Sequence, residues 1–298
     1  MRPSRSGTGA PARCVLACGP MALASNRFEE LPGGRFHFLD RGDAGAPVLF
    51  LLHGFNQTAH SWDELAEWAV GAGFRAIAVD QRGHGDTSRA PAGDYSREAM
   101  ADDPVALADA IGVDRFAVIG MSMGAVHAVL LAARHPGRAR ALVIVDWAPE
   151  VEASGVAVIA QVATLSWASF DEAVEAMRRF NPRRSEDNIR ARLAHSLGPA
   201  DDGRWRWKVD SAGLGAHPRF REPPDAMWRA LAQVSCPALV VRGAESPLVS
   251  EEAAARVAAA LAQGTVVTVP DAAHSVPGDN PAGFRSAVAD FLLERARG

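Results

Sequence analysis

Short runs of mainly apolar residues alternate with segments of helical periodicity along most of the chain. Runs of this kind predict strands that are buried on both faces of a sheet. They lie at residues 47–52, 74–80, 116–119, 139–146, 237–242 and 265–270. Helical patterns lie between them, at residues 61–70, 99–111, 251–261 and 281–295, and a further helical segment follows residue 122. Strands that alternate with helices at this spacing predict an α/β fold, with a mostly parallel sheet that carries helices on both faces.

The pattern differs at both ends of the predicted sheet domain. Residues 27–40 alternate around Pro32-Gly33-Gly34, which predicts an antiparallel hairpin. Between residues 147 and 234 the strand rhythm stops and no convincing buried strand is found. Helical patterns replace it, at residues 156–165, 170–180, 187–197 and 224–233. We therefore predict a sheet domain made of residues 26–146 and 235–298, with residues 147–234 inserted as a helical cap.

The first 25 residues are predicted to be a disordered extension. An alternative is a secretory signal, because three arginines precede a short apolar patch at residues 14–24. Gly19-Pro20 interrupts that patch, which favours the extension.

Composition narrows the classes of function. Hydrophobic residues make up 48% and charged residues 22%, as in ordinary globular proteins. A net charge of −4 without a long basic run argues against nucleic acid as the main partner. No apolar run is long enough to span a bilayer. The three cysteines are an odd number, so a disulfide framework is not expected and a reducing cytoplasm fits.

The stretch at residues 115–129, RFAVIGMSMGAVHAV, contains the most informative motif. An apolar strand runs into Gly120-Met121-Ser122-Met123-Gly124, and a helix-compatible segment follows. The pattern G-x-S-x-G between a strand and a helix is typical of a nucleophile elbow, in which a tight, strained turn presents the serine hydroxyl. Ser122 is therefore the candidate nucleophile.

Four elements together make the sequence resemble the α/β-hydrolase superfamily from residue 28 onward. They are His53-Gly54 after a buried strand, the loop from Asp80 to Ser88 with the pattern D-x-R-G-x-G-x-x-S, the elbow around Ser122, and Ala273-His274 after the last strand. The resemblance implies a serine hydrolase. A serine hydroxyl needs a base to become nucleophilic, and the family places its catalytic histidine where His274 lies.

The same resemblance implies an oxyanion hole and a pocket. The donors would be the backbone N–H groups of Met123, which follows the serine, and of Phe55, which follows the His-Gly pair. Phe55, Trp147 and Trp167 are predicted to line the substrate pocket.

The acid of the triad is open, because the chain departs from the family pattern. The loop at residues 243–250 contains Ser246 and Pro247 where an aspartate is expected. Asp146 ends the strand after the elbow strand, a position from which some branches supply their acid. Glu245 lies in the usual loop and is the alternative acid, and a serine-histidine dyad is the third possibility. The absence of an aspartate in the usual loop favours Asp146.

Other polar residues have structural interpretations. Asp80, Arg82 and Ser88 are expected to brace their glycine-rich loop. Asp102 and Asp103 are expected on a solvated helix face. Cys236 is expected to be a buried, small apolar residue.

The sequence thus predicts cleavage of a small-molecule carboxylic ester through an acyl-enzyme, with no metal and no organic cofactor. Amide or lactone hydrolysis would use the same residues. Hydrolysis of carbon–carbon bonds in diketone-like substrates and a non-catalytic ligand-binding role are further alternatives. Dehalogenase and epoxide hydrolase chemistry is disfavoured, because those relatives carry aspartate at the elbow.

Overall fold

The computed structural model describes residues 24–150, 161–162, 164–216 and 224–297. A sheet of eight strands lies at its centre, in the order β1-β2-β4-β3-β5-β6-β10-β11. Strand β2 pairs antiparallel with β1 and β4, and every other pairing is parallel. The prediction of an α/β fold with a mostly parallel sheet is therefore confirmed. The strands are β1 (Ser25–Leu31), β2 (Gly34–Arg41), β3 (Val48–Leu52), β4 (Arg75–Val79), β5 (Phe116–Met121), β6 (Ala139–Val145), β10 (Ala238–Gly243) and β11 (Gly264–Val269).

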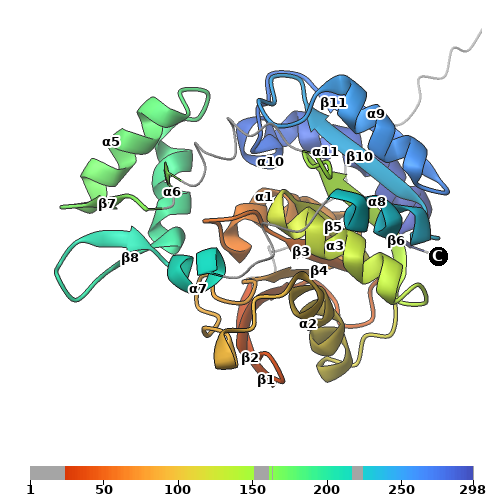
Figure 1. Ribbon diagram of the computed structural model, residues 1–298, viewed down its shortest axis with the longest axis horizontal. Coiled ribbons are helices and arrows are strands. Elements are labelled where there is room, and N and C mark those ends of the chain that lie inside the picture. The colour runs from red at the N-terminus through yellow and green to blue at the C-terminus, as the bar shows by residue number, and fades with distance from the viewer. Residues whose placement is uncertain (1–23, 151–160, 163, 217–223, 298) are drawn as a thin grey trace, which may run out of the picture.

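The sheet separates two hydrophobic cores, because successive side chains of a strand point to opposite faces. In β3, Phe50 and Leu52 belong to one core, whereas Leu49 and Leu51 belong to the other. Helices cover both faces, as Figure 1 shows. The first core packs under α2 (Arg97–Ala110), α3 (Met123–Arg134), α8 (Pro224–Gln233) and α9 (Glu251–Ala260). The second packs under α1 (Asp63–Gly71), α10 (Val276–Asp279) and α11 (Pro281–Arg295).

Residues 164–216 form a separate outer lobe beside the sheet, which Figure 1 shows in green. Its small core contains Trp167, Val174, Ile189 and Leu193. Besides its helices, the lobe contains three short strands that form an antiparallel sheet, which the helical patterns of the sequence did not indicate. The elements of the lobe are β7 (Ser166–Trp167), α5 (Phe170–Phe180), α6 (Glu186–Ser196), β8 (Leu197–Pro199), β9 (Trp205–Trp207) and α7 (Ser211–Ala216).

Helix α8 differs from its expected place. The sequence placed residues 224–233 in the cap, but Met227, Ala230 and Leu231 are buried in the core beside α3. Most of the helix predicted at residues 156–165 lies outside the described residues.

The glycine-rich loop after β4 joins the outer lobe to the sheet. Gly85 N donates a hydrogen bond to Lys208 O, and Asp210 N donates to Gly83 O, both at 2.8 Å. The buried Tyr95 hydroxyl donates to Asp210 Oδ2 at 2.7 Å, and burial raises the pKa of Tyr95 to about 12. These bonds fix one end of the lobe against the core.

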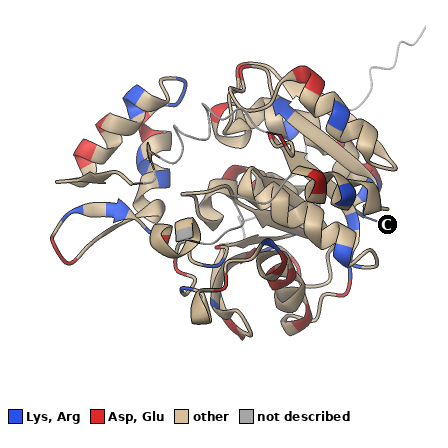
Figure 2. Ribbon diagram, viewed as in Figure 1, with Lys and Arg blue, Asp and Glu red and all other residues tan. Residues whose placement is uncertain are grey.

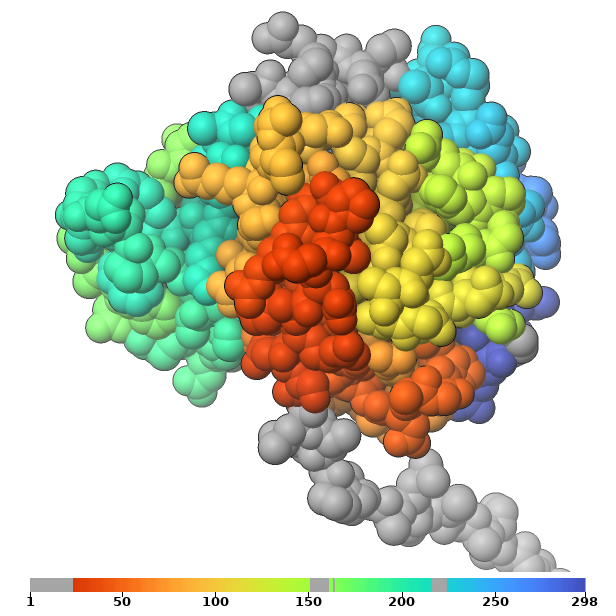
Figure 3. Space-filling model, turned by 90° about the horizontal axis from the view of Figure 1, so that it is seen from below, coloured from red at the N-terminus to blue at the C-terminus, as the bar shows by residue number. Residues whose placement is uncertain are grey.

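Charged residues of both signs are spread over the molecule. Figure 2 shows acidic and basic residues interspersed on both the sheet domain and the lobe. In Figure 3 the β1–β2 hairpin lies across one face of the molecule, with the lobe projecting beside it.

No helix in the described part of the chain has the length and apolarity that crossing a bilayer would require. The predicted N-terminal extension lies outside the described residues up to residue 23, and Ser25 already belongs to β1.

Two residues of α2 correct an expectation. Asp103 is not on a solvated face: its carboxylate accepts two hydrogen bonds from Arg82, at 2.6 and 2.9 Å, and both side chains are buried. Burial raises the pKa of the Asp103 carboxyl, and Arg82 partly offsets this. Asp102 lies at the surface, but it pairs with Arg134 and with the ring of His135. Arg82 also donates to Asp94 O, so it ties the glycine-rich loop to α2 and to the segment before it.

We expect Asp103→Asn to lower the free energy of unfolding by about 3–5 kcal/mol, because it leaves the buried Arg82 charge uncompensated. Asp102→Asn is the matched control on the same helix, where loss of an exposed pair costs about 0–1 kcal/mol. Urea denaturation followed by circular dichroism measures both. Equal losses for the two variants would contradict the assignment of a buried pair.

Candidate active site

Ser122 occupies a strained turn between β5 and α3. Its backbone angles are φ 53° and ψ −114°, in a region that non-glycine residues rarely adopt. The flanking glycines allow close packing there. A Cβ on Gly120 would lie 2.2 Å from Gly124 O, and a Cβ on Gly124 would lie 2.2 Å from Leu52 O. The motif G-x-S-x-G therefore has a direct steric cause in this fold.

The structure brings Ser122, His274 and Asp146 together in one hydrogen-bonded chain. Ser122 Oγ lies 3.0 Å from His274 Nε2, and His274 Nδ1 lies 2.8 Å from Asp146 Oδ2. Ser122 follows β5, Asp146 follows β6, and His274 lies in the loop between β11 and α10. All three therefore sit at the carboxyl ends of parallel strands.

The positions of the protons in this series of hydrogen bonds follow from which groups can only accept a hydrogen bond. An ionised carboxylate only accepts hydrogen bonds, so His274 Nδ1 carries the proton that faces Asp146. In the neutral ring Nε2 is then unprotonated and accepts from the Ser122 hydroxyl. This tautomer leaves Nε2 free to take the hydroxyl proton when the oxygen attacks an acyl carbon.

Asp146 is held by groups from the neighbouring strand end. Gly243 N donates to its Oδ1 at 3.0 Å, and the Ser246 hydroxyl donates to its Oδ2 at 2.6 Å. Ser246 is the residue found where the family usually has its aspartate, so the loop contributes a donor to the acid instead of the acid itself. The alternative acid, Glu245, is half-exposed and pairs with Arg183. The geometry thus favours Asp146 over Glu245.

The two predicted oxyanion donors, the N–H groups of Met123 and Phe55, belong to residues near Ser122. Met123 is the first residue of α3, so its N–H has no partner within the helix. Phe55 lines the same cavity as Ser122. His53 shapes the Phe55 loop, because its Nδ1 lies 2.7 Å from Gly54 O and its Nε2 accepts from Gln81 N. Burial lowers the pKa of His53, which is consistent with a neutral, structural ring.

A cavity of about 550 Å³ opens above the serine, between the sheet domain and the outer lobe. This volume lies within the roughly 300–1,000 Å³ of typical small-molecule sites. Apolar side chains line part of its wall, among them Val162, Met177, Phe180 and Leu248. Three arginines and two carboxylates line another part, namely Arg183, Arg184, Arg192, Glu245 and Asp279.

Two predicted pocket residues lie elsewhere. Trp147 is buried in the core beneath α3 and α8, and Trp167 is buried in the core of the outer lobe. Neither lines the cavity, so these two predictions were wrong. Trp207 lines it instead; its ring packs edge-on against Trp167, with ring centroids 5.6 Å apart.

The predictions from the sequence also did not include Arg183, Arg184 and Arg192, which line the cavity. A signal was present for Arg192, because Ile189, Leu193 and Ser196 form the buried face of α6 and Arg192 lies at i+3 from Ile189. A charged residue on the buried side of a helix is uncommon unless it has a partner or a function.

One cluster among the described residues has ligand atoms close enough for a metal ion, namely His37, Asp80 and Asp86. Asp80 already accepts hydrogen bonds from Ala59 N, from Asp86 N and at the ring of His37. We assign the cluster to bracing of the glycine-rich loop, as predicted for Asp80. None of its residues lines the cavity.

Comparison with known proteins agrees with this geometry. Residues 47–281 match the family model described as alpha/beta hydrolase fold. The chain is 30% identical over 272 residues to the sn-1-specific diacylglycerol lipase ABHD11 of Mus musculus, covering 86% of this chain and 84% of that protein.

Two further relatives, and solved structures with matching names, agree with this assignment. The esterase Rv0045c of Mycobacterium tuberculosis is 28% identical over 86% of each chain, and its crystal structure gives a TM-score of 0.74 over 92% of both chains. The 2-(acetamidomethylene)succinate hydrolase of Mesorhizobium japonicum is 29% identical over 91% of this chain and 97% of that protein. A crystal structure of E-2-(acetamidomethylene)succinate hydrolase gives a TM-score of 0.81 at 25% identity, over 91% of this chain and 99% of that one. These relatives support hydrolase activity.

We expect Asp146→Asn to lower kcat for a p-nitrophenyl ester by about 10⁴-fold, because the histidine loses the partner that sets its tautomer. Glu245→Gln should retain activity within about tenfold, since it breaks only a half-exposed ion pair. Steady-state kinetics on both variants checks this. The reverse order of effects would assign the acid to Glu245.

Proposed function

Because this chain belongs to the α/β hydrolase fold family, we propose that it is a serine hydrolase that cleaves carboxylic esters of small molecules. The observation that carries the proposal is the chain of contacts from Ser122 Oγ to His274 Nε2 and from His274 Nδ1 to Asp146 Oδ2. The esterase and lipase among its relatives support the same class of reaction.

The proposed reaction follows from the roles of these groups. Ser122 Oγ attacks the ester carbonyl carbon while His274 Nε2 takes the hydroxyl proton. The N–H groups of Phe55 and Met123 stabilise the oxyanion, and Asp146 stabilises the imidazolium. His274 then gives its proton to the leaving alkoxide, which departs as the alcohol. A water molecule, deprotonated by His274, attacks the acyl-enzyme and releases the acid.

The outer lobe is proposed to act as the substrate-shaping cap. It supplies cavity residues from α5 and α6, such as Met177 and Leu193, while the sheet domain supplies Ser122 and His274. Acyl and alcohol preference would then depend on side chains of the lobe that take no part in bond breaking.

Amide hydrolysis is the second candidate. It is favoured by the relative named 2-(acetamidomethylene)succinate hydrolase, whose name describes an acyl group on nitrogen. The same three residues would serve, with an amine as the leaving group. Matched p-nitrophenyl esters and p-nitroanilides of one acyl chain, together with a lactone, distinguish the candidates by their kcat/KM values.

We expect a fluorophosphonate to modify one residue, Ser122, because an activated serine attacks phosphorus as it attacks an acyl carbon. Intact-mass and peptide mass spectrometry measure the adduct. Ser122→Ala should remain unlabelled and lose about 10⁶-fold in kcat. Well-folded wild-type protein without an adduct, and without ester or anilide turnover, would sink the proposal in favour of a non-catalytic binding role.

A further inference from the structure

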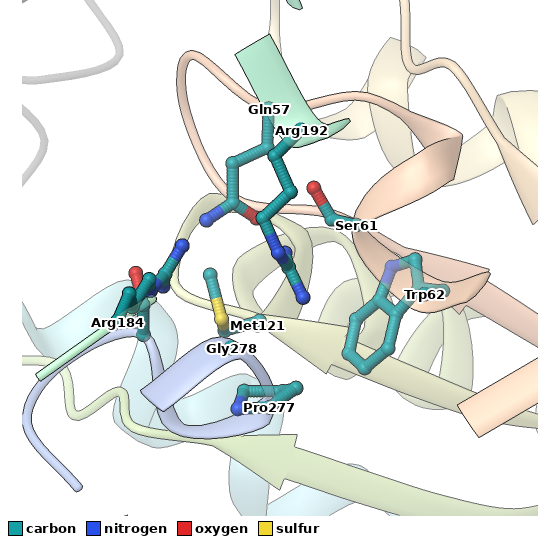
Figure 4. Close-up of a pocket in the computed structure, with 9 residues that line it drawn as sticks. Gln57, Ser61, Trp62, Met121, Arg184, Arg192, Pro277 and Gly278 are labelled. Carbon is teal, nitrogen blue, oxygen red and sulfur yellow. The ribbon is translucent and has the colours of Figure 1, made fainter. Parts of the chain in front are cut away.

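Arg192 projects from α6 of the outer lobe into the inner end of the cavity. It lines both the main cavity and a narrow recess that continues from it beneath Gln57 and Ser61. Figure 4 shows its guanidinium group between Ser61, Met121 and Trp62. Ser122 follows Met121 directly and lines the same main cavity. The cation therefore faces the space in which a substrate must lie.

Arg192 has no protein acceptor among the described residues, whereas the other cavity arginines do. Arg184 donates to Asp279 at 3.0 Å, and Arg183 pairs with Glu245. Each of these pairs is neutral as a whole. Within the described part of the cavity wall, Arg192 is thus the cation that the protein's own carboxylates leave without an ion pair.

The carboxylates outside the cavity that act on Arg192, Asp63 and Glu64, have other partners. Asp63 accepts from Arg41 and from the ring of His60, at 2.6 and 3.0 Å. Glu64 acts on Arg192 only at long range and accepts from Asn188. Arg192 is partly buried, and the loss of hydration that this causes is not offset by an ion pair within the protein, so its position favours an anion from outside the protein.

A second donor in the same recess also has no partner. The indole Nε1 of Trp62 is buried without an acceptor among the described residues. Figure 4 shows this nitrogen turned toward Ser61 and Arg192. The recess as it stands is too narrow for a water molecule. An anion would therefore bind Arg192 from the main cavity, at the mouth of the recess.

The charge of Arg192 persists at neutral pH. Burial, together with the nearby positive charge of Arg184, lowers its pKa to about 10. This value lies well above 7, so the group stays a cation with several N–H donors to offer.

We propose that Arg192 binds a carboxylate carried by the substrate, so that the enzyme selects anionic esters over neutral ones of the same length. The proposal rests on the hydrolase function proposed above and assigns its substrate class. A guanidinium and a carboxylate match in geometry and form paired, charge-assisted hydrogen bonds. The scissile bond would lie at Ser122 and the carboxylate at the inner end of the cavity.

The test compares two esters of one acyl length, mono-p-nitrophenyl adipate and p-nitrophenyl hexanoate. For the wild type, kcat/KM should be higher for the adipate ester. Arg192→Gln should lower kcat/KM for the adipate ester by about 10- to 100-fold and leave the hexanoate ester unchanged. Arg192→Lys should retain part of the preference, because it keeps the charge but not the forked geometry.

Arg190→Gln is the matched control on the same helix. Arg190 is exposed and pairs with Asp171 and Glu186, so its loss should change neither ester's kinetics. Equal losses on both esters in Arg192→Gln would indicate a packing role and overturn the proposal. So would an unchanged preference for the adipate ester.

Binding without turnover separates this inference from the proposed function. Free adipate should raise the Tm of the wild type and of Arg190→Gln, but not that of Arg192→Gln. A wild type that fails to label at Ser122 yet shows this pattern would refute the hydrolase and retain the anion site. Labelling at Ser122 without any adipate effect would do the opposite. A rise with inorganic phosphate but not with adipate would overturn the assignment to a carboxylate.

Discussion

The turn at Ser122 is the constraint on which the site depends. A non-glycine residue at positive φ costs about 1–3 kcal/mol, and such a residue persists only where its surroundings enforce it. Here β5 runs directly into α3, and Ser122 N donates to Val145 O at the end of β6. Because Gly120 and Gly124 have no side chains, the turn packs against β3 without collision. The free-energy cost of the strained backbone at Ser122 is thus offset by the pairing of three buried strands, β3, β5 and β6.

The same pairing explains how the acid can come from β6. Strands β6 and β10 are parallel, with Val145 opposite Val241, so Asp146 lies beside the loop that follows β10. A carboxylate on either strand end could reach His274. In this chain Asp146 adopts a positive φ of 49°, and Gly243 N and the Ser246 hydroxyl hold its two oxygens. Ser246 after β10, where an aspartate is expected, and Asp146 after β6 therefore belong to one arrangement, in which the serine supports the acid.

An element could be predicted from the sequence when its burial left a clear pattern of apolar residues. Strands β3, β4 and β5 are buried along their whole length, so uniform apolar runs revealed them. Strands β7, β8 and β9 have two or three residues each, too few for a period of two to appear. Ser122 and His274 stood out through their motifs, which reflect steric and chemical demands.

No comparable apolar run or motif in the sequence identified the residues of the cavity wall. Tryptophan is both a packing residue and a pocket residue, and its position in the sequence does not distinguish the two roles. Trp147 and Trp167 proved to be core residues, whereas Trp207, on the same small sheet as Trp167, reaches the cavity. Which side of a short strand faces a cavity depends on how the lobe docks. That docking is set by long-range bonds such as Tyr95 to Asp210, which no local pattern reveals.

The division of labour between the two parts of the molecule has a consequence for kinetics. Ser122, His274 and Asp146 belong to the sheet domain, whereas Arg192 belongs to the outer lobe. A carboxylate far from the scissile bond keeps its charge throughout the reaction, so Arg192 would stabilise the ground state and the transition state about equally. Uniform binding of this kind lowers KM and leaves kcat almost unchanged. The lobe would therefore govern which ester is selected, while the strained turn and its hydrogen-bonded chain govern how fast the selected ester reacts.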